Sequence, residues 1–435
     1  MIHRHSTYHQ QLPRDERLLI IGNGMAGHRL LETLLKKPQR PAHITVIGAE
    51  RAPAYNRILL SPLLAGEMER QALTLHDADW YAEQGVELVL GEHVESIDRQ
   101  AHQVTTASGR EFDYDRLVLA TGSRPAMPPI PGLELAGVHG FRNLDDAAAL
   151  TRAAERGGRA VVIGGGLLGL EAAEGLRKRG MSVSIIQRDD RLMNRQLDIT
   201  AAELLEGELR SRGLKIVTNG RLSRLEDDGQ GHVRGAWLED GRFLAADCVV
   251  VAIGITPNAE LGRSCGLEIN RAVIVDAHLT SSDPAIHALG ECCEFQGQTY
   301  GLVEPIWRQV EVLAAWLAGE PVEGYIEAPT ATKLKVSGVS LYAFGPIEAD
   351  DGHEVLTYHD PQHGDYRRLL LRDDRIVGAV LYGDTAAGPW YFEQSLAGSN
   401  VQACRQALLF GAGDAKPLLA TPIRRSDIPL EEEAA

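Results

Sequence analysis

Two glycine-rich turns of identical spacing are the parts of this sequence whose residue types could bind a ligand. Gly22-Asn23-Gly24-Met25-Ala26-Gly27 follows the apolar run 18–21, and Gly164-Gly165-Gly166-Leu167-Leu168-Gly169 follows the apolar run 160–163. In such a turn the first glycine permits a tight bend, the second lets the backbone approach a pyrophosphate, and the third lets a helix pack on the sheet. The helix N-terminus then faces the phosphate charge. The pattern predicts two nucleotide-binding turns.

The residues after each turn have the periodicity of a helix and then of a second strand. Leucines between 30 and 35 precede Ile44-Thr45-Val46-Ile47, and apolar residues between 172 and 177 precede Val183-Ser184-Ile185-Ile186. Strand, glycine turn, helix and strand make up the βαβ unit of a parallel sheet. Because these features occur together twice, two glycine-rich turns without a ligand are the less favoured interpretation.

The repeat continues, because 115–122 and 247–254 are both apolar strands that end in an Ala-x-Gly sequence. After about residue 325 the sequence changes character and predicts a smaller α+β region. Its expected elements are strands 333–336, 366–371 and 376–381, a hairpin turn at Asp373-Asp374, and helices 389–396 and 401–409.

These patterns predict an α/β fold with two Rossmann-like dinucleotide-binding domains, the second inserted in the first, and a small C-terminal α+β domain. The chain of 435 residues is long enough for several domains. The expected boundaries are a polar tail 1–16, the first domain 17–130 and 260–325, the second domain 131–259, a C-terminal interface domain 326–425 and an acidic tail 426–435.

The composition limits the function classes. Lys plus Arg number 44 and Asp plus Glu number 60, so the net charge of −16 argues against a general nucleic-acid binder. Five cysteines without repeated spacing exclude a disulfide scaffold and a multi-cysteine zinc module. The polar start, with His3, His5 and His9, is typical of a solvated tail rather than a metal site or a targeting peptide. No apolar run is long enough for a membrane span, so we expect a soluble, cytoplasmic protein without a metal.

The chain resembles the two-dinucleotide-binding-domain flavoproteins, in which the first site holds FAD and the second NAD(P)H. The resemblance covers about residues 17 to 425. It is strongest to the flavin-containing N-terminal part of the large subunit of NAD(P)H nitrite reductase and to rubredoxin reductases. The segments that carry it are 22–29, 53–57, 117–125, 164–171, 191–193, 280–292, 301–303 and 332–335.

The resemblance implies an FAD site in the first domain. The first turn would cradle the pyrophosphate, Arg57 would lie near the phosphates, and Thr121-Gly122 would pass under the flavin. Gly290-Glu291 would meet the ribityl chain, and a helix beginning near Pro305 would direct its positive end at the flavin. The implied FAD contacts are Gly22, Gly24, Met25, Ala26, Gly27, Glu50, Arg57, Ala120, Thr121, Gly122, Gly290 and Glu291.

One FAD contact departs from the family pattern. A carboxylate at the end of the second strand should hold the adenosine ribose, but Gly48 stands there. Glu50 is the nearest carboxylate and takes this role in our assignment. A solvated surface glutamate is the alternative interpretation of Glu50.

The second site bears on the choice of nicotinamide cofactor. An acidic residue after the second strand binds the NAD ribose, whereas an arginine accommodates the extra phosphate of NADP. Here Gln187-Arg188 occupies that place, which favours NADPH slightly, although Asp189-Asp190 follows and a solvated charge cluster is the alternative. The residues expected to contact NAD(P)H are Gly164, Gly166, Leu167, Leu168, Gly169, Gln187, Arg188 and Gly254, with Glu171 either near the nicotinamide or on the helix surface.

The cysteines argue against a thiol relay. The sequence has no Cys-x-x-Cys or Cys-x4-Cys pair of the kind that disulfide reductases use. The adjacent Cys292-Cys293 favours two reduced thiols at a strand end over a redox pair, because disulfides are rare in the cytosol. No cysteine follows Cys404, so cluster ligands for nitrite reduction are not expected in this chain.

Together these features predict an FAD-dependent NAD(P)H oxidoreductase, in which the flavin rather than a side chain performs the catalysis. It would pass electrons to a separate metalloprotein, either a sirohaem or molybdenum component of a nitrite or nitrate reductase of nitrate assimilation, or a rubredoxin or ferredoxin. A flavin-bearing interaction protein that responds to NAD(P)H is an alternative from a different class. Homo-oligomerisation stays open.

Overall fold

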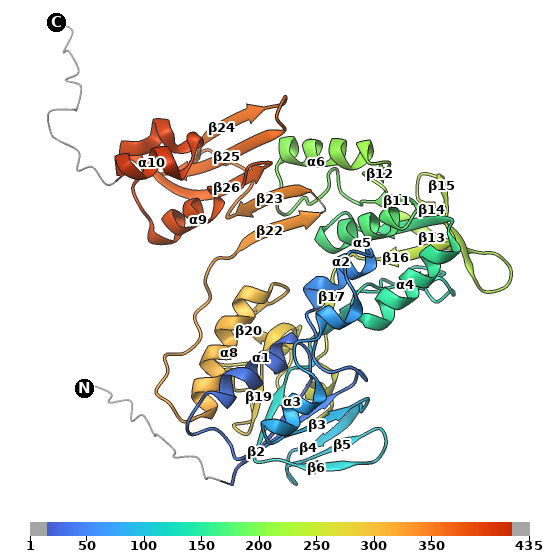
Figure 1. Ribbon diagram of the computed structural model, residues 1–435, viewed down its shortest axis with the longest axis vertical. Helices are drawn as coiled ribbons and strands as arrows, with labels where there is room; N and C mark the ends of the chain where they lie inside the picture. Colours follow the sequence, from blue (N-terminus) through green and yellow to red (C-terminus); the bar gives the residue numbers. More distant parts are fainter. Residues whose placement is uncertain (1–14, 337, 420–435) are drawn as a thin grey trace, which may run out of the picture. The chain divides into compact units, whose positions relative to one another are not determined.

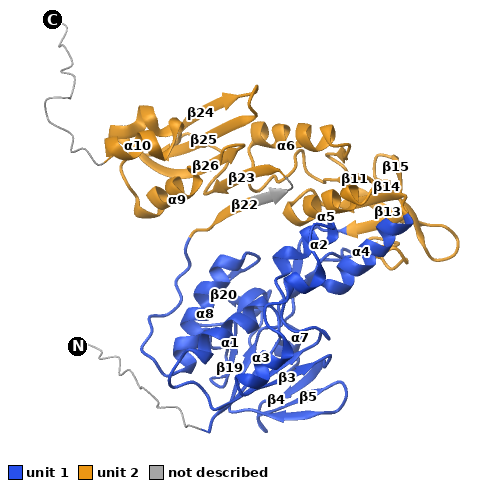
Figure 2. Ribbon diagram, in the orientation of Figure 1, with its two compact units in different colours: residues 1–129, 139–156, 251–328 blue, residues 130–138, 157–250, 329–435 orange. Residues whose placement is uncertain are grey.

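The computed structural model describes residues 15–336 and 338–419, and the chain divides into two compact units. Unit 1 consists of residues to Pro129, His139–Arg156 and Val251–Ala328, and unit 2 consists of Ile130–Val138, Gly157–Val250 and the residues from Pro329 (Figure 2). The chain therefore leaves unit 1, builds part of unit 2 and returns, as an inserted domain requires. The domain boundaries given above stay a prediction.

A five-stranded parallel sheet forms the centre of unit 1, in the order β19-β7-β1-β2-β3. Figure 1 labels β19, β2 and β3 of this sheet. The inner strands β1 and β7 read as apolar runs after their first residue, because both faces of a parallel sheet are buried there. Helices α1 (Met25–Leu35) and α8 (Val303–Leu317) lie side by side and pack with this sheet in one core. The strands are β1 Arg17–Ile21, β2 His43–Gly48, β3 Val86–Leu90, β7 Arg116–Leu119 and β19 Ile286–Ala288.

Smaller elements of unit 1 connect these strands. Three further sheets are β4-β5-β6, β8-β17 and β18-β20-β21. Their strands are β4 Val94–Asp98, β5 Gln103–Thr106, β6 Glu111–Asp113, β8 Ser123–Pro125, β17 Ile255–Pro257, β18 Val273–Ile274, β20 Cys293–Phe295 and β21 Gln298–Thr299. The remaining helices are α2 Leu60–Leu64, α3 Ala78–Glu83, α4 Leu144–Arg156, α7 Glu260–Ser264 and the 3₁₀ helices η1 Arg57–Leu59, η2 Arg70–Leu73 and η3 Gly290–Cys292.

Unit 2 contains a second five-stranded sheet with the matching order β12-β11-β10-β16-β9. In both sheets the strand before the glycine turn is central and the next strand lies beside it. The repeat predicted from the sequence is therefore also present in the structure. The sheet strands are β9 Val138–His139, β10 Arg159–Ile163, β11 Ser182–Ile186, β12 Lys215–Val217 and β16 Cys248–Val251. The associated elements are α5 Leu167–Lys178, α6 Ile199–Ser211, β13 Leu222–Asp227, β14 Val233–Leu238 and β15 Phe243–Ala245.

The C-terminal part of unit 2 is an antiparallel sheet in the order β22-β23-β26-β25-β24. The predicted hairpin turn is present, with Asp373 and Asp374 at φ of 51° and 56°. The helix expected at 401–409 is present as the 3₁₀ helix at 402–410. The elements are β22 Ala331–Val336, β23 Val339–Phe344, β24 Glu354–Asp360, β25 Asp365–Arg372, β26 Arg375–Tyr382, α9 Gly388–Ala397, η4 Gln402–Phe410 and α10 Ala412–Leu419.

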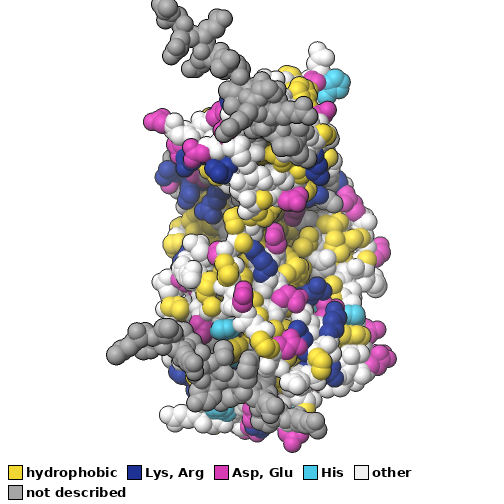
Figure 3. Space-filling model, turned by 90° about the vertical axis from the view of Figure 1, so that its left-hand side faces the viewer, with side chains coloured by type: hydrophobic (Ala, Val, Ile, Leu, Met, Phe, Trp, Pro, Cys, Tyr) yellow, Lys and Arg dark blue, Asp and Glu magenta, His cyan; other side chains and the backbone are white. Residues whose placement is uncertain are grey.

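The predicted fold class is confirmed, with two Rossmann-like sheets and a small C-terminal α+β part. None of the helices in the described residues has the length and apolar character to cross a membrane. On the face drawn in Figure 3, acidic and basic side chains lie intermingled with apolar ones.

Candidate functional site

The first glycine turn closes tightly at two of its three glycines. Gly22 has a φ of +115°, and a Cβ there would lie 2.1 Å from the carbonyl oxygen of Ala120. A Cβ on Gly27 would lie 2.1 Å from the carbonyl oxygen of Gly22. Both positions therefore require glycine, because any side chain would collide with backbone atoms. This close packing holds the start of α1 against the end of β1.

Gly24 is left open on the side away from the sheet. Its backbone is extended, with φ of −82° and ψ of −174°, and a Cβ would find only Arg57 nearby, at 3.8 Å. The first amide groups of α1 have no partner within the helix, and the Nδ2 atom of Asn23 is buried without a hydrogen-bond partner. The turn thus offers amide donors and open space, which are the requirements of a phosphate cradle.

A charged cluster lies beside this cradle. One Glu50 oxygen is 2.5 Å from Arg57 Nη2, and the other accepts a hydrogen bond from the Tyr55 hydroxyl at 2.8 Å. Arg57 also donates to the carbonyl of Arg142 at 3.1 Å. Burial alone would lower the pKa of Arg57, but Tyr55 and Glu50 raise it, so the guanidinium stays charged. A fixed cation beside open amide groups suits a phosphate ligand.

The predicted residues near the flavin form a second group in unit 1. A Cβ on Gly122, whose φ is +65°, would lie 3.8 Å from Glu291 Oε2. The Thr121 hydroxyl donates to the Asn258 carbonyl at 2.8 Å. Gly290 has a φ of +82° and donates its amide to Gln309 Oε1 at 2.8 Å. The fold therefore brings the ends of β7 and β19 together.

Residues that sequence reasoning missed hold this group in place. Ser123 donates to Glu291 at 2.9 Å, and the guanidinium of Arg142 contacts the same carboxylate. Asn258 and Gln309 supply the hydrogen bonds described above. Ser123 adjoins the Ala-x-Gly motif, so that motif could have identified it from the sequence. Arg142 lies outside every motif and carries no local signal.

The second glycine turn has the same backbone. Gly164 has a φ of +116°, and Gly166 is extended with φ of −85° and ψ of −179°. A Cβ on Gly166 would meet no atom within 4 Å. Leu167, Leu168 and Gly169 form the first turn of α5, with Leu168 exposed. This turn therefore also provides an open helix N-terminus in unit 2.

Gln187 and Arg188 differ in their placement. Gln187 is buried, and its Oε1 accepts a hydrogen bond from the Gly165 amide at 2.9 Å while its Nε2 donates to Asp189 at 3.2 Å. Arg188 has 74% of its side chain exposed, with its nearest Asp189 oxygen at 3.6 Å. Gln187 thus shapes the turn, whereas Arg188 is accessible to a ligand.

Glu171 and Gly254 are the two remaining residues that the sequence predicted for the NAD(P)H site. Glu171 is half-buried on α5. Gly254, with φ of +132°, is exposed after β16 among the residues of unit 1, and its carbonyl accepts a hydrogen bond from Ala126 at 2.9 Å. A Cβ on Gly254 would meet no atom within 4 Å.

All five cysteines of the sequence lie in the described residues, and none of them forms a disulfide. Cys292 and Cys293 are fully buried, and their thiols lie 3.3 Å from the carbonyls of Leu289 and Gly290. Burial raises the pKa of both thiols, and Cys292 adds to the rise for Cys293. Buried neutral thiols are poor nucleophiles, so the geometry matches reduced structural cysteines.

Comparison with known proteins agrees with this geometry. Residues 16–312 match the pyridine nucleotide-disulphide oxidoreductase family, and residues 330–394 match the rubredoxin NAD+ reductase C-terminal domain. The chain therefore belongs to the pyridine nucleotide-disulphide oxidoreductase family. The predicted oxidoreductase class and the resemblance to nitrite and rubredoxin reductases are confirmed.

The relatives fall into two groups. The assimilatory nitrate reductase electron transfer subunit of Bacillus subtilis is 41% identical over 86% of this chain and 48% of its own length. The ferredoxin–NAD(+) reductase component of the biphenyl dioxygenase system of Paraburkholderia xenovorans is 34% identical over 83% of this chain and 88% of its own. The chain thus spans about half the length of the first relative and most of the second.

Solved structures share the whole fold. A chain in the crystal structure of the covalent putidaredoxin reductase–putidaredoxin complex has a TM-score of 0.81 at 27% identity, covering 92% of this chain and 96% of that one. The NADH:rubredoxin oxidoreductase of Clostridium acetobutylicum has a TM-score of 0.75 at 26% identity, covering 91% of this chain and 99% of that one.

Proposed function

We propose that this protein is an FAD-dependent NAD(P)H oxidoreductase that passes electrons to a separate one-electron acceptor, a metalloprotein component of a nitrite or nitrate reductase. The main observation in support of this proposal is the open Gly24 cradle, with the fixed cation Arg57 beside it. The Gly122–Glu291 group lies in the same unit. When bound, FAD accepts a hydride from NAD(P)H and releases electrons one at a time.

The residues of unit 1 fit FAD. The amide groups of the first turn, at Gly24, Met25 and Ala26, would bind the pyrophosphate, and Arg57 would balance its charge. Glu50 would bind the adenosine ribose while it holds Arg57 in position. Thr121-Gly122 and Gly290-Glu291 would lie along the flavin and its ribityl chain. Gly122 and Gly290 both take left-handed φ values, which glycine adopts without strain.

For the nicotinamide nucleotide, the second turn would bind the pyrophosphate through Gly166 and the start of α5. The exposed Arg188 favours NADPH over NADH, because a solvent-accessible guanidinium can pair with the 2′-phosphate. Gln187 would line this site with its side-chain amide hydrogen-bonded to Gly165 and Asp189. NADPH preference rests on Arg188 alone.

The thiols and the relatives support the proposed class of acceptor. With Cys292 and Cys293 buried as free thiols, the electrons have no disulfide to pass through on leaving the flavin. The relative from Bacillus subtilis is named an electron transfer subunit, which supports a nitrate or nitrite reductase partner. The five cysteines, none of which forms a disulfide, also support the expected cytoplasmic location.

A rubredoxin or ferredoxin is the second candidate acceptor. The match of residues 330–394 to the rubredoxin reductase C-terminal domain favours it, as does the likeness to a ferredoxin reductase component over nearly its full length. The two candidates differ only in the protein that docks, because the flavin chemistry is the same.

The test has two stages. Purified protein should contain one FAD per chain and take up two electrons per flavin in a reductive titration; uptake of four electrons, with a thiolate charge-transfer band, would contradict the proposal. Stopped-flow reduction by NADPH and NADH then precedes reoxidation by purified sirohaem or molybdenum reductase, rubredoxin and ferredoxin at matched concentrations. Useful rates with oxygen or quinones alone would replace the electron-donor assignment by an oxidase or dehydrogenase.

A further inference from the structure

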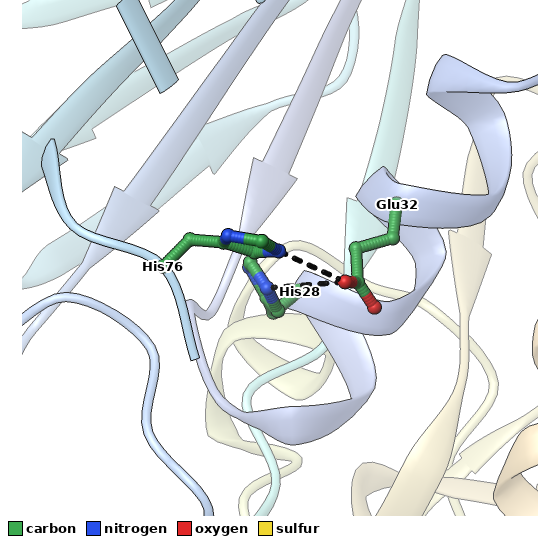
Figure 4. Close-up of side chains that lie close together, drawn as sticks. All are labelled: His28, Glu32 and His76. Atoms are coloured by element: carbon green, nitrogen blue, oxygen red, sulfur yellow. Dashed lines mark hydrogen bonds and ion pairs between the residues drawn. The ribbon is translucent and has the colours of Figure 1, made fainter. Parts of the chain in front are cut away.

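Two histidines and a glutamate meet at the surface of α1 (Figure 4). His28 and Glu32 are one helical turn apart on α1, and His76 comes from the segment just before α3. One ligand atom from each of the three side chains lies within 4.8 Å of the other two. No step of the proposed electron transfer uses these residues.

The distances match the requirements of a small cation. Glu32 Oε1 is 3.1 Å from His76 Nε2 and 3.9 Å from His28 Nε2. Zinc binds nitrogen and oxygen at about 2.0–2.2 Å in a tetrahedron, which sets the donor atoms roughly 3.3–3.5 Å apart. Small side-chain adjustments would therefore place an ion between the three atoms.

His28 supplies the observation that points to a ligand. Only 1% of its side chain is exposed, and its Nε2 atom is buried without a hydrogen-bond partner. That nitrogen points toward Glu32 (Figure 4). A buried polar atom without a partner is costly, so native structures normally satisfy it. A metal ion between His28 and Glu32 would do so.

A hydrogen-bond chain sets the tautomer of His28. The Tyr81 hydroxyl donates to Asn23 Oδ1 at 3.0 Å, so toward His28 Nδ1, at 2.7 Å, it acts as acceptor. His28 therefore carries its proton on Nδ1 and presents a lone pair on Nε2. Metal-binding histidines typically donate their other ring N–H to such a partner. Asn23 belongs to the first glycine turn, so this chain also connects the cluster to the turn.

The surroundings leave the other two ligands available. Arg29 pairs with the second Glu32 oxygen, at 3.4 Å, so Oε1 remains directed at the histidines. The His76 ring stacks on Trp80 with 4.0 Å between ring centroids, which fixes its orientation. Glu32 and His76 are 25% and 34% exposed, so the cluster opens to solvent on one side.

We propose that His28, Glu32 and His76 form a binding site for a divalent transition metal of the zinc type, with water as the fourth ligand. Two imidazoles and one carboxylate suit zinc better than the hard ions magnesium or calcium. Three protein ligands and one open position are a common zinc arrangement. The site is independent of the proposed flavin function.

The experiment measures zinc binding to the purified flavoprotein by isothermal titration and by metal analysis after dialysis. Glu32→Gln and His76→Gln are the test variants, because both side chains are partly exposed and their replacement spares the core. The exposed His93→Gln is the matched control, and His3→Gln/His5→Gln/His9→Gln removes binding by the N-terminal histidines. Flavin content is measured in every sample.

We expect one zinc per chain in the wild type, the His93 variant and the triple variant, and affinity reduced about 100-fold or more in Glu32→Gln and His76→Gln. Zinc should also raise the unfolding temperature of the wild type and not that of Glu32→Gln. Equal zinc binding by all proteins, loss of zinc in the triple variant alone, or no binding by the wild type would overturn the site. If the purified protein binds zinc at this site but contains no flavin, that result contradicts only the proposed function.

Discussion

The two glycine turns of this protein share the backbone conformation of their matching glycines. Gly22 and Gly164 have φ of +115° and +116°, and each donates its amide to the end of the next strand at 2.8 Å. Gly24 and Gly166 are both extended N-caps of their helices. The resemblance extends to the strand order of the two sheets. The difference between the two regions therefore lies in the side chains that surround each turn.

Around the first turn, the segment after β2 brings Arg57 within 3.8 Å of a Cβ on Gly24, and Glu50 holds that arginine. Around the second turn, nothing lies within 4 Å of the same point on Gly166, and Arg188 extends into solvent. The first turn is equipped to retain a charged ligand and the second is left accessible. This contrast fits a resident cofactor in one and an exchanging substrate in the other.

The largest effect should come from Gly24→Val. The extended backbone of Gly24 accepts a side chain, and only the end of Arg57 is near, so the variant should fold but lose its FAD because the Cβ blocks the pyrophosphate. Absorbance of the flavin per chain, with circular dichroism for folding, measures this. Gly166→Val is the control and should keep its flavin while losing reduction by NADPH. Full flavin content in Gly24→Val would remove the first turn from the FAD site.

Arg57→Ala should weaken FAD binding about 100-fold. The charge-assisted contact to phosphate is worth about 1.5–3 kcal/mol, and Glu50 would lose its cationic partner as well. Equilibrium dialysis of flavin from the variant measures the change in Kd. The nearby exposed Arg51→Ala controls for net charge and should change Kd less than about threefold. A similar loss in both variants would show a general charge effect.

Arg188→Ala should raise the KM for NADPH roughly tenfold to a hundredfold and leave that for NADH nearly unchanged. The exposed guanidinium is the one group expected to pair with the 2′-phosphate, a contact worth about 1.5–3 kcal/mol. Steady-state kinetics with both cofactors measures this, with the exposed Arg221→Ala as control. Equal losses for NADPH and NADH would mean that Arg188 does not recognise the phosphate.

The smallest effect concerns the edge strands of the two sheets, which each carry a histidine. Burial lowers the pKa of His287 on β19 from 6.5 to about 3, and lowers that of the half-buried His139 on β9 as well. The unfolded chain then binds more protons than the folded one below pH 6.5, so stability is present above that pH and lost as the pH falls.

From about pH 7.5 to about pH 5.5, His287 should therefore cost roughly 1.4 kcal/mol of unfolding free energy. Urea unfolding at both pH values should show a weaker pH dependence in His287→Gln than in the wild type. His139→Gln should reduce the dependence less, since that histidine is only partly buried. An unchanged slope in His287→Gln would show that this histidine is not buried in its neutral form.

Much of the fold was predictable because its signals are local. Positive φ at Gly22 and Gly164 is a property of one residue, and a buried parallel strand such as β10 reads as an unbroken apolar run. The antiparallel strands β23 and β24 were missed, and the helix expected at 401–409 is the 3₁₀ helix η4. These elements depend on packing in their own sheet more than on their own periodicity.

The sequence did not predict the contacts in the sites between side chains from distant segments. Arg142 and Glu291 are 149 residues apart, and His76 is 44 residues from Glu32. The sequence around each of these residues carries no sign of its partner, since contact is decided by which strand ends and helices the sheet brings together. Gln187 shows the same limit, because only the folded turn directs its amide inward to Gly165.

By itself the sequence determined the two glycine turns, their strands and the family of the protein, because backbone conformation and apolar periodicity act over a few residues. The tertiary structure decided what surrounds each turn. It places the Glu50–Arg57 pair beside the first turn and leaves open space beside the second. It also forms the His28–Glu32–His76 cluster at α1. These arrangements depend on long-range packing, which places side chains from separate segments at distances that no local pattern encodes.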